Sequence, residues 1–268
     1  MPKYACKIFY LGTAYHGSQY QPNLPTIQGE LINALSKWSD YEYSPATVAL
    51  SGRTDKGVHS IGQLVCIETE DKIQINQINK HLPEDIVLWA KTGVPQDFNP
   101  RYSVLFRHYR YYLDRNQNKV DISNIMQAAS YLEGVHDFQF LSKPDGDRST
   151  KTVLLNVCIT KDKTIFLDFY GLSFLWKLVR KSVTLLLNIG KGKVDPTVCR
   201  RLLDGKNVVP SGIEPAPPEN LVLMDAAIPL QMKRNKNALN IIRKRLKKWI
   251  SYFRRQQTAL EGIVADWF

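Results

Sequence analysis

Cysteines are few in this sequence, and none is close to another. Its 268 residues contain four, at positions 6, 66, 158 and 199. No Cys-x-x-Cys or Cys/His pair has metal-ligand spacing, so we expect no zinc site and no disulfide framework. Three of them, Cys6, Cys66 and Cys158, lie in apolar strand-like runs, where a buried structural thiol is the usual outcome.

Long hydrophobic runs are also missing. The best run, residues 183–187, is far shorter than the roughly 18 residues of a membrane-spanning helix. Residues 1–6 lack the hydrophobic centre of a signal peptide. A hydrophobic fraction of 44% and a charged fraction of 23% are typical of a soluble globular protein of one large or two ordinary domains. We therefore expect a cytoplasmic protein without a membrane partner.

Acidic residues are outnumbered, 25 against 36 Lys and Arg, which gives a net charge of +11. The excess is concentrated in residues 231–268, which hold ten Lys or Arg and two acids, a net +8. The remaining 230 residues therefore carry only +3. A charge of this sign indicates a polyanionic partner, either a nucleic acid or an anionic membrane surface.

The order of the expected elements predicts an α+β fold. Alternation predicts a strand over residues 3–11, and apolar spacing predicts a helix that Thr26 caps. Further strands at 46–50, 63–68 and 86–90 and a helix at 75–81 complete a ferredoxin-like order. The order then recurs, with strands at 106–113, 153–159, 164–170 and 221–224 and helices at 121–132, 174–189 and 195–203.

We thus predict two ferredoxin-like (RRM-like) halves that form a largely antiparallel sheet flanked by helices. The expected divisions are residues 1–100, 101–230 and 231–268, with the halves joined near 95–105. In the last segment, apolar residues recur at helical spacing between Leu239 and Phe253 while lysines and arginines occupy the other positions. This pattern predicts a basic amphipathic helix. Its apolar stripe could pack on the body, its basic face could contact RNA, or it could bind a membrane surface.

The stretch from Leu50 to Gln63 concentrates charged and polar side chains between glycines. Three glycines at five-residue intervals bracket Arg53-Thr54-Asp55-Lys56, between two strand-like runs. Glycine permits a tight, irregular loop, and a lone carboxylate between two cations is a plausible catalytic group. An ordinary hairpin turn at Asp-Lys-Gly is the alternative.

The string Ser-Gly-Arg-Thr-Asp-Lys-Gly-Val-His-Ser closely resembles the Gly-Arg-Thr-Asp-x-Gly-Val-His motif of the TruA family of tRNA pseudouridine synthases. The resemblance implies that Asp55 is the catalytic aspartate. It also implies that Arg53 and His59 bind substrate.

Residues 98–111 interleave arginines with aromatic rings, a combination that suits single-stranded RNA. On a strand, Arg107, Tyr109 and Tyr111 would share one face. A Tyr-rich core strand with an arginine at its edge is the alternative. The segment is similar to the family's Phe-x-Ala-Arg-x-Ser…Arg-x-Tyr-x-Tyr motif, although Pro100 stands where the family usually has Ala. The resemblance implies that Tyr109 packs against the flipped uracil and that Arg101, Arg107 and Tyr111 bind RNA.

Three further segments resemble family motifs. Phe174 to Arg180 matches Phe-x-x-x-x-Val-Arg, which implies that Arg180 pairs with the catalytic aspartate. Pro218 to Leu223 resembles Pro-x-Gly-Leu-x-Leu with Asn220 in place of Gly, and it implies that Leu221 packs on the target base. Residues 10–19 resemble Tyr-x-Gly-Thr-x-Phe-x-Gly-Trp-Gln with Ser18 in place of Trp, which implies a substrate-binding role for Gln19.

The resemblance implies an isomerase that converts uridine to pseudouridine in tRNA, without cofactor or metal, as a homodimer. It implies uridines on the 3′ side of the anticodon stem-loop, about positions 38–40 of the tRNA, which must be flipped out of their helix to react. A non-catalytic RNA-binding protein or RNA chaperone of ferredoxin-like fold is the alternative. Against it stands the complete set of Asp55, Tyr109 and Arg180, because pure binding needs no carboxylate beside phosphates.

Overall fold

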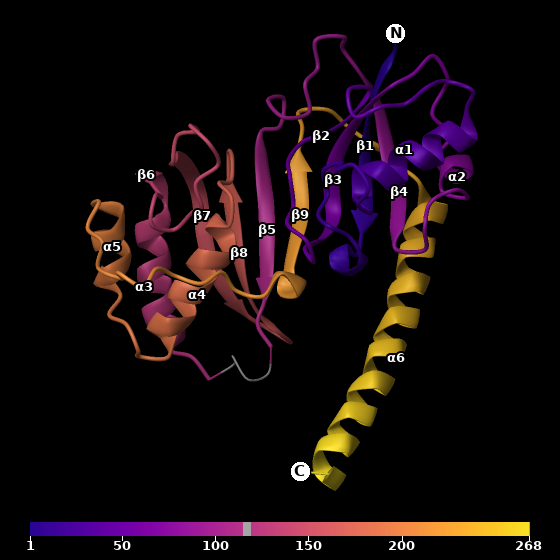
Figure 1. The fold of residues 1–268 in the computed structure, drawn as a ribbon. Helices are drawn as coiled ribbons and strands as arrows, with labels where there is room; N and C mark the ends of the chain where they lie inside the picture. The colour runs from indigo at the N-terminus through magenta and orange to yellow at the C-terminus, as the bar shows by residue number, and fades with distance from the viewer. Residues whose placement is uncertain (115–118, 268) are drawn as a thin grey trace.

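A single mixed sheet runs through the whole body of the protein. The computed structural model describes residues 1–114 and 119–267. In these residues the sheet has ten strands in the order β10-β4-β1-β3-β9-β5-β8-β7-β6, with β2 paired to β3 (Figure 1). Neighbouring strands are antiparallel except β3 and β9, which are parallel. The strands are β1 (Lys3–Tyr10), β2 (Val48–Leu50), β3 (His59–Glu68), β4 (Ile86–Val94), β5 (Phe106–Tyr112), β6 (Gly134–Asp137), β7 (Lys151–Lys161), β8 (Ile165–Gly171), β9 (Leu221–Ala227) and β10 (Lys233–Arg234).

Helices α1 (Ile27–Trp38) and α2 (Ile75–Ile78) belong to the N-terminal half. Thr26 caps α1 as predicted, since its hydroxyl accepts a hydrogen bond from the Gly29 amide at 3.2 Å. The apolar face of α1 then buries Leu31 and Leu35 in one core with Ile8 and Tyr10 of β1. Burial of these side chains holds the helix on the sheet.

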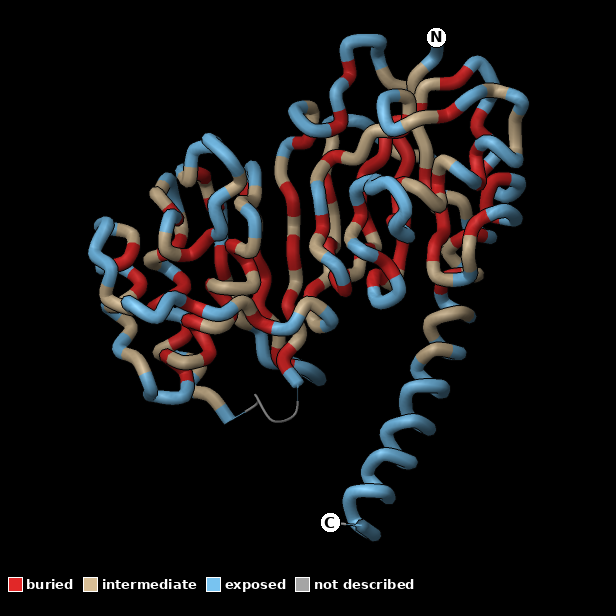
Figure 2. Tube along the Cα trace, viewed as in Figure 1, coloured by how far each residue is buried: buried red, intermediate tan, exposed pale blue. Residues whose placement is uncertain are grey.

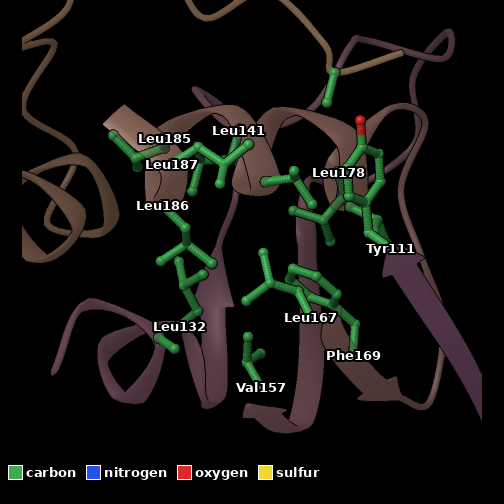
Figure 3. Close-up of a cluster of buried hydrophobic side chains, with 14 of the residues drawn as sticks. Tyr111, Leu132, Leu141, Val157, Leu167, Phe169, Leu178, Leu185, Leu186 and Leu187 are labelled. Carbon is green, nitrogen blue, oxygen red and sulfur yellow. The ribbon is translucent and has the colours of Figure 1, made fainter. Parts of the chain in front are cut away.

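Helices α3 (Ile122–Leu132), α4 (Leu178–Gly190) and α5 (Thr197–Leu203) belong to the C-terminal half. The core between them and the strands is built around α4, with Leu178 and Leu186 in one cluster with Tyr111, Leu167 and Phe169 (Figure 3). Because alternate residues of β5 face this core, Tyr109 and Tyr111 are buried there while His108 and Arg110 face the opposite side.

The two halves join where β3 meets β9, with His59 opposite Val222 and Ser60 opposite Leu223. The Ser60 hydroxyl donates to the Leu223 carbonyl at 3.0 Å. Gly62 is required here, because a Cβ at this position would lie 2.3 Å from the Met224 carbonyl oxygen. The junction brings the start of β9 beside the start of β3, immediately after the Asp55 loop.

The structure confirms the predicted fold class: a largely antiparallel sheet with flanking helices and a long C-terminal helix. The short strands β6 and β10 were not predicted. Helix α4 begins at Leu178 rather than 174, because Lys177 has a left-handed backbone conformation with φ of +65°. The four cysteines are free, and three of them are buried. We retain the divisions 1–100, 101–230 and 231–268 as a proposal, since the linker between β4 and β5 spans residues 95–105.

Helix α6 (Lys236–Trp267) starts against the N-terminal half and then leaves the body (Figure 1). Ala238 and Ile242 are buried, whereas every described residue after Trp249 is exposed (Figure 2). The packing of its first turns confirms part of what the apolar spacing predicted. No helix among the described residues is both long enough and apolar enough to cross a membrane.

Candidate active site

Asp55 lies in the loop between β2 and β3, and both of its carboxylate oxygens are engaged. The Arg180 guanidinium donates to Oδ2 from Nη1 at 2.8 Å. The Trp176 indole donates to Oδ1 from Nε1 at 3.1 Å. Two donors on two different oxygens fix the plane of the carboxylate, and the cation compensates for its charge.

Arg180 is itself held in place. It stands in the first turn of α4, and its Nε donates to the Ala216 carbonyl at 2.6 Å. The Ala216 amide in turn donates to the Arg180 carbonyl at 3.0 Å. Nε of the guanidinium is thus used on the backbone while Nη1 binds Asp55, and the segment before β9 is fixed to α4.

A second set of hydrogen bonds supports the loop from beneath. Ser18 Oγ accepts from the Thr54 amide at 2.8 Å, and the Ser18 amide donates to the Thr54 carbonyl at 3.1 Å. The Thr54 and Tyr10 hydroxyls are 2.9 Å apart, and burial raises the pKa of Tyr10 to about 12. Tyr10 is therefore a neutral hydrogen-bond partner for Thr54. Three hydrogen bonds, through its amide, its carbonyl and its hydroxyl, thus hold Thr54, the residue before Asp55, in place.

The loop is closed by contacts with the turn that follows β1. The Gly57 amide donates to the Gly12 carbonyl at 3.2 Å, and the Gly12 amide donates to His59 Nδ1 at 3.0 Å. Nδ1 must therefore be unprotonated, and burial lowers the pKa of His59 in agreement with a neutral ring. A Cβ on Gly12 would lie 2.1 Å from the Val58 carbonyl oxygen, so only glycine allows this approach.

Tyr109 stands beside this carboxylate on β5. It is 7% exposed, and its ring lies edge-on to Phe174 with centroids 4.9 Å apart. Burial raises the pKa of Tyr109, and the negative charge of Asp55 raises it further, so the phenol is neutral. The structure thus brings together Asp55, Arg180 and Tyr109 from three separate segments.

The sequence is similar to known proteins over most of its length. A family model described as tRNA pseudouridine synthase matches residues 128–229. This chain is 41%, 42% and 36% identical to proteins named tRNA pseudouridine synthase A from Methanothermobacter thermautotrophicus, Methanosarcina acetivorans and Pyrococcus abyssi, respectively. The alignments cover 87%, 82% and 82% of this chain and 84%, 82% and 82% of those proteins. The chain belongs to the family of tRNA pseudouridine synthases.

Three residues that the family motifs suggested as RNA contacts lie inside the protein. The Arg107 guanidinium is buried and donates to the carbonyls of Ser51 at 2.6 Å and Leu172 at 2.7 Å. Tyr111 and Leu221 belong to the C-terminal core. In this arrangement Arg107 ties the start of the Asp55 loop to the end of β8, and its donors are occupied by backbone rather than available to phosphate.

The remaining predicted residues and several unpredicted cations surround the loop. Arg53, Lys56, Arg101 and Gln19 are exposed. The Lys143 ammonium lies 4.2 Å from the centroid of the Trp176 ring, with the Lys177 ammonium 5.7 Å from it on the same ring. Such exposed cations suit a phosphate backbone. Among the described residues, no group of three His, Cys, Asp or Glu side chains is placed to hold a metal ion.

Sequence reasoning missed Trp176 and Ser18 as parts of the site. The only signal for Trp176 was its position in the motif that carries Arg180, four residues earlier. Ser18 was noted only as a departure from a family tryptophan, yet its buried hydroxyl binds the Thr54 backbone. Asn220, the other departure, donates from its side chain to the Tyr112 carbonyl at 2.8 Å, and its φ is not positive.

Proposed function

We propose that this tRNA pseudouridine synthase isomerises uridine in the anticodon stem-loop of tRNA, with Asp55 as the group that starts the reaction. Because it belongs to this family, the protein is an isomerase that acts on tRNA uridine. The assignment of Asp55 is supported by the hydrogen bonds that both of its carboxylate oxygens accept, close to the buried Tyr109. A surface carboxylate in a simple hairpin turn would have no such partners.

The proposed reaction begins when the target uridine leaves its helix, at a cost of a few kcal/mol for unstacking and unpairing. The exposed cations Arg53, Lys56 and Arg101 would hold phosphates around the flipped nucleotide. Tyr109 would form the apolar wall for the uracil, and Leu221, buried in the same hydrophobic cluster, would support that wall from the core.

Asp55 then initiates cleavage of the glycosidic bond between ribose C1′ and uracil N1. Arg180 maintains the orientation of the carboxylate and balances its charge throughout. The freed uracil turns within the pocket and rejoins C1′ through its C5 carbon. C5 loses a proton to the solvent and N1 takes one up, so that substrate and product are isomers and the step needs neither an oxidant nor a reductant.

We further propose that the protein is cytoplasmic and works as a homodimer on one tRNA. The net +8 of residues 231–268 and the exposed cations beside Asp55 would give a molecule as long as tRNA two places at which to bind. The proposal of a homodimer rests on the resemblance to the family described above.

The test is tritium release from an unmodified tRNA transcript labelled at uridine C5. Wild type should release tritium, whereas Asp55→Asn should release none and still bind the transcript. Asp71→Asn is the matched control, because this exposed carboxylate binds Ser39 and stands away from the loop. Full activity of Asp55→Asn would refute the assignment of Asp55. Tight tRNA binding without release by any form would instead favour non-catalytic RNA binding.

A further inference from the structure

Helix α6 is anchored at one end only. Ala238 and Ile242 are buried in the N-terminal core, with Leu239 and Leu246 packed against it. Lys248 pairs with Glu84 at 2.7 Å, near the end of the anchored part. Residues 250–267 then extend into solvent (Figure 2).

One seam of mostly apolar residues continues from the anchored part into the exposed part. Its residues alternate at spacings of three and four: Leu239, Ile242, Leu246, Trp249, Phe253, Gln256, Leu260, Ile263 and Trp267. This 3.5-residue period is that of a left-handed coiled coil, whose a and d positions meet a partner helix. We call the six residues from Trp249 to Trp267 the distal seam. Only Gln256 in it is polar.

From Phe253 onward the distal seam is exposed in the single chain, whereas Trp249 is half-buried. Leu260 is 63% exposed and Trp267 is 81% exposed. The segment also contains Gly262, and a glycine inside a helix costs about 1 kcal/mol relative to alanine. Most helical stability in proteins comes from packing of an apolar face rather than from propensity, so a packed partner would stabilise this segment.

The charges indicate which kind of partner the distal seam suits. Residues 236–248 carry six Lys or Arg and no acid, a net +6. Residues 249–267 carry two arginines, one glutamate and one aspartate, a net charge of zero. RNA and anionic membranes both attract cationic segments, which here end at the anchored half. An apolar, neutral, heptad-spaced face fits another helix of the same kind.

We propose that the distal seam pairs in antiparallel orientation with the distal seam of a second copy of this chain. The orientation follows from the anchoring. In a parallel pair the partner helix would lie along the whole seam, including Ile242, which the chain's own body already covers. In an antiparallel pair the partner's helix occupies only the exposed part, and the two bodies lie at opposite ends.

The register follows because the partner can occupy only the exposed part of the helix. When the a positions of one distal seam meet the d positions of the other over its whole length, the two-fold axis lies near residue 258. The overlap is about 27 Å long, from 1.5 Å per residue. In this register the following side chains face each other across the pair: Trp249 and the partner's Trp267, Phe253 and the partner's Ile263, Gln256 and the partner's Leu260, Ile250 and the partner's Val264, and Tyr252 and the partner's Asp266. Ala259 then lies beside the partner's Ala259, next to the axis. The inference is independent of the proposed catalytic roles.

Cysteine cross-linking tests both the pairing and its direction, in full-length protein with Cys158→Ser to remove the least buried native thiol. Ala259→Cys should form a covalent dimer on mild oxidation, whereas Trp267→Cys should not. A paired thiol meets its partner at an effective concentration on the order of millimolar, so at micromolar protein its oxidation should be roughly 1,000-fold faster than that of an unpaired thiol. Equal slow rates would overturn the pairing, and rapid linking of Trp267→Cys alone would overturn the antiparallel direction.

Leu260→Glu added to Ala259→Cys provides the matched disruption. Because Leu260 lies on an exposed turn of α6, its substitution leaves the fold of the body intact. The double variant should cross-link at the slow rate of an unpaired thiol. If cross-linking is unchanged, the seam does not mediate the pairing and the proposal fails. RNA as the occupant would show instead as tRNA binding that falls with Leu260→Glu while the Ala259→Cys rate stays slow throughout.

Discussion

Trp176→Phe tests whether the indole hydrogen bond helps to orient Asp55. The substitution removes Nε1–H, which donates to Asp55 Oδ1 at 3.1 Å, and keeps an aromatic ring beside Lys143. Arg180 remains on the other oxygen, so the carboxylate keeps its charge partner. The expected defect is one of orientation alone.

The magnitude follows from the exposure of the donor. A hydrogen bond to a charged group contributes about 1.5–3 kcal/mol when buried. Trp176 is 42% exposed, so water can replace much of the lost bond. We therefore expect a loss of about 1 kcal/mol in the reacting complex, which corresponds to a roughly fivefold lower kcat.

The assay is tritium release measured under single-turnover conditions, with tRNA affinity measured separately. Because the bond acts on the reacting carboxylate, kcat should fall while the Kd for tRNA stays the same. Trp38→Phe is the matched control: its indole also donates to a side chain, Gln77 Oε1 at 3.0 Å, but on α1 away from Asp55. An unchanged kcat with weakened tRNA binding would refute the positioning role and make Trp176 an RNA contact.

Three further changes test the loop and the tail. Gly12→Ala should reduce activity severely, because the new Cβ would lie 2.1 Å from the Val58 carbonyl oxygen and displace the loop that carries Asp55; Gly93→Ala, in open space, is its control in the tritium assay. Burial lowers the pKa of His59, so its contribution to stability is complete above the ordinary value near 6.5 and is lost as pH falls towards the lowered value. Melting temperatures between pH 7.5 and 5.5 should therefore decline less in His59→Asn, which keeps an acceptor for Gly12, and an identical decline would count against His59. Replacing Arg243, Lys244 and Lys247 by Gln should lower the slope of log affinity for tRNA against log salt by about 1 per lost phosphate contact, and an unchanged slope would exclude RNA contact by the anchored half of α6.

Local pattern was enough to predict most elements of the fold, because alternation and helical spacing directly report which face of a segment is buried. Thr26 was predicted as a cap from its type and place, and it is one. The start of α4 was predicted too early, since no local signal shows that Lys177 takes a left-handed conformation before the helix. The strand β10 was missed because two residues, Lys233 and Arg234, are too few to show a period.

Sequence alone determined the chemical identity of the candidate site and the amphipathic character of the tail. Only the tertiary structure decided which residues meet. Arg107 and Tyr109 alternate along one strand and both face inward, yet Arg107 binds backbone carbonyls while Tyr109 stands near Asp55. Trp176 and Asp55 are 121 residues apart, and their contact depends on the parallel junction of β3 and β9. The physical reason is that periodicity encodes burial within a segment, whereas partners across segments are fixed by how the sheet assembles.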